Sequence, residues 1–401
     1  MGLSSRFSPV KDCTPHEQNY TVLNDVSELW WQTADGNKAE SNKPKHSFLS
    51  LKPQKLLSRQ RNTTVETQTL YFTDLESKKC GFVQLLLSSV LGGISTNIQL
   101  NLKLFDCDNE GELGSWETFK IDDVTKFSQD GMKSRHSSFQ LIPSQGQEIG
   151  NLLICAINLK SQKGRYLNAN LSTTLRTGFK VDPDGSSFYS DEGSSKPPRI
   201  MRHVFVPQGL CTGSICIEGG GQPRSTVNLE KVPAMFIEAL QGISPHKAAS
   251  CWNFSCFQNY EIGAVCMEYT TTSEFQKTVV TVTGIARNGK ISAVYASSEN
   301  ESSVSARKHV KFLQTSKDPQ NKWCYPSSIS FPLDGPNNVL KLDPLRLVNK
   351  YDILDELPAI IKRVVESIAG IKPFIYQYCQ IAEFDGESGV AIAESTFISE
   401  S

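Results

Sequence analysis

Apolar and polar residues alternate in short runs along most of this chain. Two runs show the pattern most clearly, with apolar positions at Ile98, Leu100, Leu102 and Leu104 in one and at Leu167, Ala169, Leu171 and Leu175 in the other. A period of two places one face of a strand in a core and the other face in water. Turn-forming stretches such as 182–185 separate the runs. The spacing predicts antiparallel β-sandwiches or barrels.

The pattern predicts further strands later in the chain, at 277–287, 290–297 and 374–378. Residues 299–339 contain several Pro, Ser and Asn residues and are expected to be loop-rich. One amphipathic helix is expected at 358–368. Pro358 suits a first helical position, and the apolar residues that follow share one face.

The length of 401 residues exceeds what one core usually supports, so we expect two domains. The expected segments are 1–64, mostly flexible; 65–218, a first barrel; 219–230, a linker; and 231–401, a second barrel. Trp30 and Trp31 are expected to mark where the first segment docks on the fold. The glycine-rich break at Gly219–Gly221 is the reason for placing the linker there.

The charge balance argues against nucleic acid as a partner, because 41 Lys and Arg residues are matched by 42 Asp and Glu residues. The N-terminus lacks the apolar run of a secretory signal, and the 11 cysteines show no dense spacing. We therefore expect reduced thiols and a cytoplasmic location, with the nucleus also open. No apolar run is long enough to span a bilayer as a helix.

Motifs for familiar chemistry are missing from the sequence. There is no Walker loop, no dinucleotide-binding glycine motif opening a helix and no nucleophile elbow, so no cofactor is expected. The histidines and cysteines do not have zinc spacing, and no metal is expected. The acidic stretch 106–111 is interpreted as a hairpin loop rather than a calcium site, because a strand precedes it. A catalytic Cys–His pair stays open, since such partners meet only in space.

The segment 236–258 combines Trp252, Phe254 and Phe257 with a Pro-His-Lys turn. Taken alone, its aromatic residues indicate a core. The segment resembles the start of the second domain in the fungal survival-factor family. Further matching stretches occur in the same order as in that family: Trp31-Gln32-Thr33, 65–72, 81–84, 184–189, 201–205, 239–254, 369–378 and 394–399. The resemblance covers the chain from about residue 30 to its end.

This resemblance implies a mainly β protein of two tandem lipocalin-like antiparallel β-barrels with a C-terminal amphipathic helix. It also implies survival under oxidative stress and a link to sphingolipids, through binding and transfer of ceramides between membranes. Cys251 stands where the family commonly has Arg, and 1–13 is poor in apolar residues. The chain therefore resembles a diverged paralogue.

We expect a lipid-binding protein that is not an enzyme, with a ceramide-like ligand and transient membrane contact. The candidate head-group donors are Arg202, His203 and His246, and the candidate wall residues are Trp252, Phe254, Tyr376 and Tyr378. The same residues could instead hold the domain interface together. A cofactor-independent hydratase or cyclase is the main alternative, with Glu66 or Glu268 as the acid or base. A filled-barrel interaction module is the third, and no oligomeric state follows from the sequence.

Overall fold

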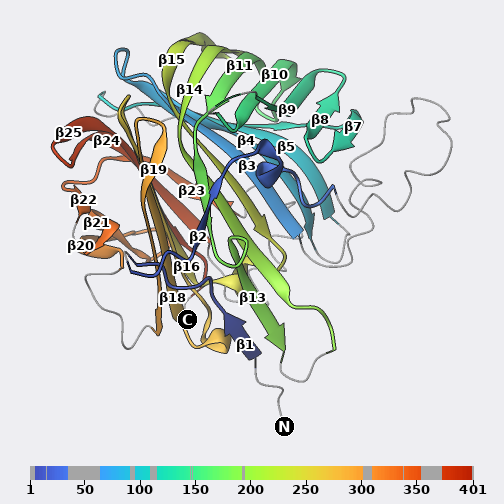
Figure 1. The fold of residues 1–401 in the computed structure, drawn as a ribbon. Helices are drawn as coiled ribbons and strands as arrows, with labels where there is room; N and C mark the ends of the chain where they lie inside the picture. Colours follow the sequence, from blue (N-terminus) through green and yellow to red (C-terminus); the bar gives the residue numbers. More distant parts are fainter. Residues whose placement is uncertain are drawn as a thin grey trace.

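The protein is mainly β, and its strands form antiparallel, curled sheets (Figure 1). The computed structural model describes residues 5–14, 16–34, 64–90, 95–108, 115–144, 146, 148–191, 195–300, 309–336, 338–353 and 373–399. The predicted helix at 358–368 lies outside these residues. No helix in the described part of the chain is long and apolar enough to cross a membrane.

The first sheet has 15 strands in the described part of the chain. Their bounds are β1 (Ser5–Ser8), β2 (Tyr20–Leu23), β3 (Thr64–Thr73), β4 (Lys79–Val90), β5 (Ser95–Asp106), β6 (Ser115–Lys120), β7 (Val124–Ser128), β8 (Gly131–Ser134), β9 (Ser137–Pro143), β10 (Gly150–Lys160), β11 (Arg165–Leu175), β12 (Gly178–Val181), β13 (Ser186–Asp191), β14 (Arg199–Gly219) and β15 (Gln222–Gln241). The main path runs β6-β5-β4-β3-β15-β14-β11-β10-β9-β8-β7. A bridge between Phe119 and Ser161 shows how far the sheet curls back on itself.

The predicted linker at 219–230 is wrong, because this stretch belongs to the longest hairpin of the first sheet. β14 and β15 pair from Gly219 and Gln222 at the turn to Met201 and Gln241 at the far end. Gly219, Gly220 and Gly221 have φ angles of 87°, 63° and 74°, a region that glycine enters without steric cost. The glycines therefore make a tight turn.

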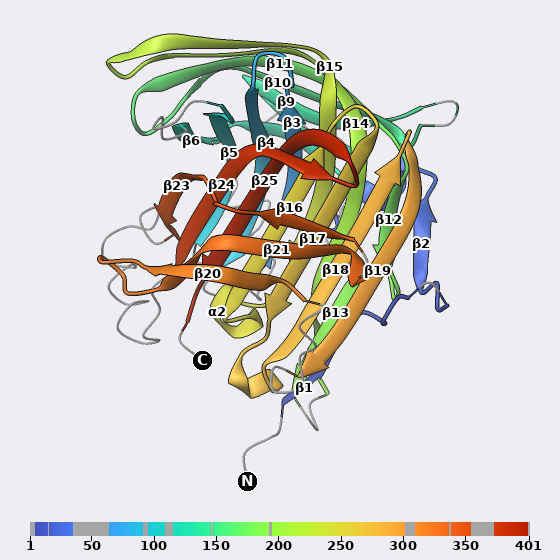
Figure 2. The same cartoon turned by 90° about the vertical axis from the view of Figure 1, so that its left-hand side faces the viewer.

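The second sheet begins after the four-residue helix α2 (Pro245–Ala248) and has the order β19-β18-β17-β16-β25-β24-β23. Its strands are β16 (Cys251–Gln258), β17 (Ile262–Thr270), β18 (Thr278–Arg287), β19 (Lys290–Asn300), β23 (Leu347–Asp352), β24 (Phe374–Phe384) and β25 (Glu387–Phe397). A third sheet covers its outer face and consists of β20 (Lys311–Lys317), β21 (Cys324–Pro336) and β22 (Val339–Leu342) (Figure 2). The stretch 299–339, which the sequence predicts to be loop-rich, thus contains the strands β20 and β21.

Three apolar clusters hold these layers together. The first cluster fills the concave side of the first sheet, the second lies between the first and second sheets, and the third lies between the second and third sheets. Successive side chains of a strand point to opposite faces of the sheet, so neighbouring residues belong to different clusters. Phe236 of β15 belongs to the first cluster, and the next residue, Ile237, belongs to the second.

The first and second sheets approach each other closely at glycines of the second sheet. A Cβ atom added at Gly284 would lie 2.1 Å from the Phe179 ring, and one added at Gly263 would lie 2.1 Å from the Pro207 carbonyl oxygen. Phe179 itself stacks on Phe205 with ring centroids 5.2 Å apart. These contacts leave no room for a side chain at either glycine.

We predict that Gly284→Val destabilises the protein by about 1–3 kcal/mol, because overpacking forces the sheets apart. The check is the midpoint of chemical unfolding. Phe179→Ala in the same chain removes the clashing ring, so the double variant should lose less than the sum of the two single losses. Strict additivity of the two losses would contradict a direct contact.

Candidate functional site

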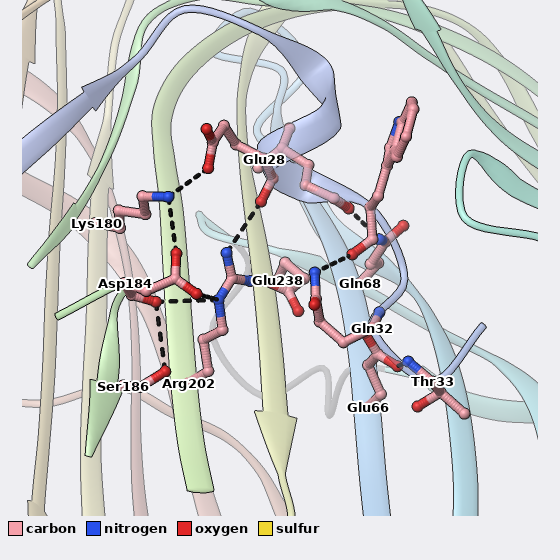
Figure 3. A network of polar contacts seen from close by, with 12 residues as sticks. Glu28, Gln32, Thr33, Glu66, Gln68, Lys180, Asp184, Ser186, Arg202 and Glu238 are labelled. Carbon is pink, nitrogen blue, oxygen red and sulfur yellow. Dashed lines mark hydrogen bonds and ion pairs between the residues drawn. The ribbon is translucent and has the colours of Figure 1, made fainter. Parts of the chain in front are cut away.

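The N-terminal segment packs against the concave side of the first sheet (Figure 3). Asp25 caps the short 3-10 helix η1 (Val26–Leu29), since its Oδ1 accepts the Ser27 N–H at 2.7 Å. Trp31 follows and is a fully buried member of the first cluster. We call residues 26–33 the plug.

Two buried polar side chains of β3 hold the plug by its backbone. The Glu66 carboxylate accepts the N–H of Gln32 at 2.6 Å and the N–H of Thr33 at 2.8 Å. Gln68 Nε2 donates to the Leu29 carbonyl oxygen at 2.6 Å. Polar groups that would be costly to bury alone are thereby paired with backbone groups that need partners.

Arg202 of β14 joins the plug to the hairpin. Its Nη2 donates to the Glu28 carbonyl oxygen at 3.2 Å, and its Nη1 forms an ion pair with Glu238 of β15. Its Nε donates to the Asp184 carbonyl oxygen at 3.0 Å. Lys180 contacts both Asp184 and Glu28, so the network continues toward the surface (Figure 3).

Burial raises the pKa values of the two glutamates in this network. Glu66 has a raised pKa because it is desolvated, although hydrogen bonds from Thr33 and Gln32 oppose the rise. Desolvation raises the pKa of Glu238 to about 8, against the opposing charge of Arg202. The site therefore holds a carboxyl group that is poised between its two protonation states near neutral pH.

Some buried polar atoms of this region have no hydrogen-bond partner in the described part of the chain. They include Oε1 of Glu238, Oε1 of Gln68 and Nε1 of Trp31. Buried polar groups are usually paired, and each exception needs a reason. Two acceptors and one donor are thus available to a ligand or to water.

A cleft of about 300 Å³ opens where the first and second sheets meet. Its lining residues are Arg176, Pro207, Gln208, Gly209, Leu210, Pro233, Ala234, Gln258, Asn259, Tyr260, Ile262, Gly263, Asn288 and Gly289. The register between β14 and β15 shifts between Val206 and Gly209. Pro207 lies within that irregular stretch and cannot donate to the ladder, so the hairpin bends at the cleft.

The polar lining of the cleft consists largely of uncharged groups. Gln208 Oε1 accepts the Gly289 N–H at 2.7 Å, and Gln258 Oε1 accepts the Thr73 hydroxyl at 3.0 Å. Tyr260 is 53% exposed. The cleft is therefore suited to a neutral ligand with hydroxyl or amide groups.

The residues predicted as head-group donors lie in three separate places. Arg202 faces the plug, whereas the adjacent His203 faces the second sheet. The His203 ring stacks on Phe205 at a centroid distance of 6.1 Å and is tilted against Tyr269 at 6.4 Å. Burial lowers the pKa of His203 to about 4, and the nearby Arg202 charge adds to this effect. His246 lies in α2, and burial lowers its pKa as well. Both histidines are therefore neutral at pH 7.

The predicted wall residues are also divided between two layers. Trp252 and Phe254 of β16 pack toward the first sheet, where Phe254 stacks on Tyr71 at 5.4 Å. Tyr376 and Tyr378 of β24 belong to the third cluster instead. The seven predicted residues do not form one site, because neighbouring positions on a strand face opposite layers.

The acid or base candidates of the enzyme alternative are both engaged. Glu268 Oε2 accepts the Thr281 hydroxyl at 2.6 Å and the Val310 N–H at 2.8 Å, and it lies 3.5 Å from His309 Nδ1. Glu66 holds two N–H groups of the plug. Both carboxylates thus have structural partners.

The sequence interpretation missed Gln68 and Glu238 and the role of Glu66 in holding the plug. A signal was available, because Glu66 and Gln68 continue the apolar positions Leu70 and Phe72 on the same face of β3. Glu238 continues Phe236 on β15 in the same way. Polar residues at core positions of a strand indicate a buried polar contact.

We predict that Arg202→Met destabilises the protein by about 1–3 kcal/mol at pH 7, because it leaves the buried and largely protonated Glu238 carboxyl group without its partner. Unfolding in denaturant measures the loss. Arg224→Met is the matched control, since Arg224 lies on the surface near Glu218 with a side chain 69% exposed. A combined Arg202→Met, Glu238→Met variant should regain much of the stability. An equal loss in the control would show that the pair is unimportant.

The raised pKa of Glu238 also predicts a pH effect. Between the ordinary value of 4.5 and about 8, the folded state binds a proton that the unfolded state has released, so stability falls as pH rises. From pH 6 to pH 8 the native protein should lose about 1–3 kcal/mol relative to Glu238→Gln. Thermal unfolding at several pH values measures this difference, and parallel profiles would contradict it.

Comparisons with known proteins agree on one family. The Svf1 family model matches residues 3–399. An SVF1-like protein of Saccharomyces cerevisiae, YLR225C, is 38% identical over 98% of both chains. The ceramide-binding protein SVF1 of Candida albicans is 28% identical over 99% of both chains. The ceramide-binding protein svf-1 of Neurospora crassa is 31% identical over 84% of this chain and 86% of its own.

A solved structure, that of CghA, has a similar fold. It matches with a TM-score of 0.50 and 11% identity, covering 96% of this chain and 99% of its own. At this identity the likeness concerns the arrangement of the sheets alone. Together with the near full-length match to the family model, the sequence relatives show that the chain belongs to the Svf1 family.

Proposed function

We propose that this protein binds a ceramide-like lipid and carries it between membranes. The observation that carries the proposal is the alignment over 99% of both chains with a relative named as a ceramide-binding protein. An alignment of that extent runs through nearly the whole length of both chains. Transfer through water requires shielding of the alkyl chains, at about 0.8 kcal/mol per buried CH₂.

We further propose that the first sheet with the plug forms one lipocalin-like barrel and that the second and third sheets form another, with a C-terminal helix. The apolar clusters on the concave side of the first sheet and between the second and third sheets support this division. Barrels of this size either fill with side chains or hold one apolar ligand.

The cleft between the sheets is our candidate for the head group. A ceramide head group is uncharged and carries hydroxyl and amide groups, which match the side-chain amide of Gln208 and the hydroxyl of Tyr260. The one cationic residue of the lining, Arg176, forms an ion pair with Glu148 at 2.9 Å. Neutral hydrogen-bonding groups therefore dominate the lining.

The alkyl chains require additional space. A volume of about 300 Å³ is at the lower end of the roughly 300–1,000 Å³ of ligand pockets. Ala234 lines the cleft and is also a member of the first cluster, so the cleft borders that apolar interior. We place the alkyl chains there, in space that the plug side chains occupy in this structure.

A carrier is favoured over an enzyme by the names of the relatives and by the carboxylates. The relatives cited above are named for binding, and Glu66 and Glu268 are engaged in structural hydrogen bonds. A general acid or base must reach its substrate. Neither group is free to do so in this arrangement.

The test is extraction of fluorescent short-chain ceramide from phosphatidylcholine vesicles, with native mass spectrometry of the recovered protein. We expect one ceramide per chain and at least about tenfold less binding for Leu210→Trp, which fills the cleft. Tyr166→Ala is the control, because Tyr166 is exposed on β11 and does not line the cleft. Protein that stays empty at all ceramide concentrations would overturn the function. Full binding by Leu210→Trp would overturn only the proposal that the head group binds in the cleft.

A further inference from the structure

Three cysteines meet between the first and second sheets. Cys80 lies on β4, Cys107 directly follows β5 and Cys379 lies on β24, with exposures of 1%, 4% and 0%. The sulfur atoms of Cys80 and Cys379 are 3.2 Å apart, although the residues are 299 positions apart in the sequence. We call these three residues the thiol triad.

The backbone around the thiol triad is held in place from both sheets. The Cys107 N–H donates to the Lys78 carbonyl oxygen at 2.9 Å, and the Cys379 N–H donates to the Arg346 carbonyl oxygen at 3.2 Å. Arg346 Nη1 crosses to the first sheet and donates to the Asp106 carbonyl oxygen at 2.8 Å. These contacts between the sheets thus hold the thiols close to one another.

The sulfur separation favours disulfide chemistry over metal binding. Thiolates around a tetrahedral zinc ion are about 3.8 Å apart, as Zn–S bonds of about 2.3 Å require. The value of 3.2 Å is shorter. Among the described residues, no group of three or more His, Cys, Asp or Glu side chains has the geometry to hold a metal ion.

One member of the thiol triad has the properties of an attacking thiolate. Hydrogen bonds from Cys379 and Cys80 lower the pKa of Cys107 to about 4, whereas burial raises the pKa values of Cys80 and Cys379. Asp108, the next residue, is exposed, so Cys107 is close to the surface. Low pKa and a neighbouring thiol are two features of oxidant-sensitive cysteines.

We propose that the thiol triad is a redox modification site that reacts with hydroperoxides and forms a disulfide between the first and second sheets. The Cys107 thiolate attacks a peroxide oxygen, the O–O bond breaks, and a sulfenic acid and hydroxide form. The Cys379 thiol attacks the sulfenic sulfur, and its proton leaves with the displaced oxygen as water. The product is a Cys107–Cys379 disulfide.

Exchange then moves the disulfide to the closest pair. The Cys80 thiol gives its proton to the hydroxide released in the first step, which forms the second water. The Cys80 sulfur then attacks Cys379 and Cys107 leaves as a thiolate, which is favoured because a thiol of low pKa is the better leaving group. For hydrogen peroxide the sum is two thiols and one peroxide giving one disulfide and two waters. The Cys80–Cys379 bond joins β4 covalently to β24.

The test treats full-length protein with hydrogen peroxide, blocks remaining thiols and separates the chains on a non-reducing gel. We expect a faster-migrating band, because the disulfide closes a loop of about 300 residues in the denatured chain, and dithiothreitol should reverse it. Trypsin places the three cysteines on separate peptides, because Lys79 and Lys103 precede Cys80 and Cys107. Mass spectrometry should therefore identify the linked pair.

Cysteine variants distinguish oxidation of the thiol triad from nonspecific oxidation of other cysteines. Cys379→Ser should abolish the fast band, and Cys107→Ser should slow its formation by about tenfold or more. Cys324→Ser, at an exposed cysteine, should leave it unchanged. Circular dichroism establishes that each variant is folded. Persistence of the band in Cys379→Ser, or peptides linking only cysteines outside the thiol triad, would overturn the proposal.

Discussion

The half of the β14–β15 hairpin away from its turn is buried on both faces, and this constraint organises the rest of the structure. Residues 204–209 of β14 and 232–238 of β15 are buried without interruption. One face of the hairpin packs into the first cluster and the other packs against the second sheet. A strand in this position cannot show an apolar–polar alternation, because neither face meets water. Each polar residue on it must instead find a protein partner or lie beside the cleft.

Arg202, Glu238 and Gln208 show the consequences of that burial. Arg202 and Glu238 pair with each other, and Arg202 also binds the plug backbone. Gln208 lies at the register shift and holds the Gly289 N–H across the sheet interface. Replacing a buried ion pair by apolar residues often costs nothing in stability, so the pair is weak evidence for stability alone. Its bond to the plug gives it a second role, which is to position the segment that covers the concave side of the first sheet.

The strands themselves could be predicted from the sequence, since the predicted runs at 98–104 and 167–175 lie in β5 and β11 and nearly all of 277–287 forms β18. The expected wet face is present on β11, but on β5 this expectation is wrong, because Gln99, Asn101 and Lys103 are buried. Local patterns could not show where chain segments distant in sequence meet. Three consecutive glycines suit a linker and a hairpin turn equally well, and only the pairing of β14 with β15 separates the two. Arg202 and His203 are adjacent in sequence but face opposite layers. The candidate site residues chosen from the sequence therefore do not lie in one site. The plug contacts join segments more than 30 positions apart, and no local period encodes them.

The cleft and the thiol triad are connected structurally through β3. Thr73 donates to Gln258 of the cleft and pairs in register with Cys80 of the thiol triad. A ligand can gain space either by separating the sheets at the cleft or by displacing the plug from the first cluster. The tight contact of Gly284 with Phe179 opposes separation of the sheets, and a disulfide at the thiol triad would oppose it further. Plug displacement breaks hydrogen bonds to Glu66, Gln68 and Arg202 but leaves the sheets in place. Oxidation of the thiol triad should therefore restrict a ligand that enters between the sheets and spare one that replaces the plug.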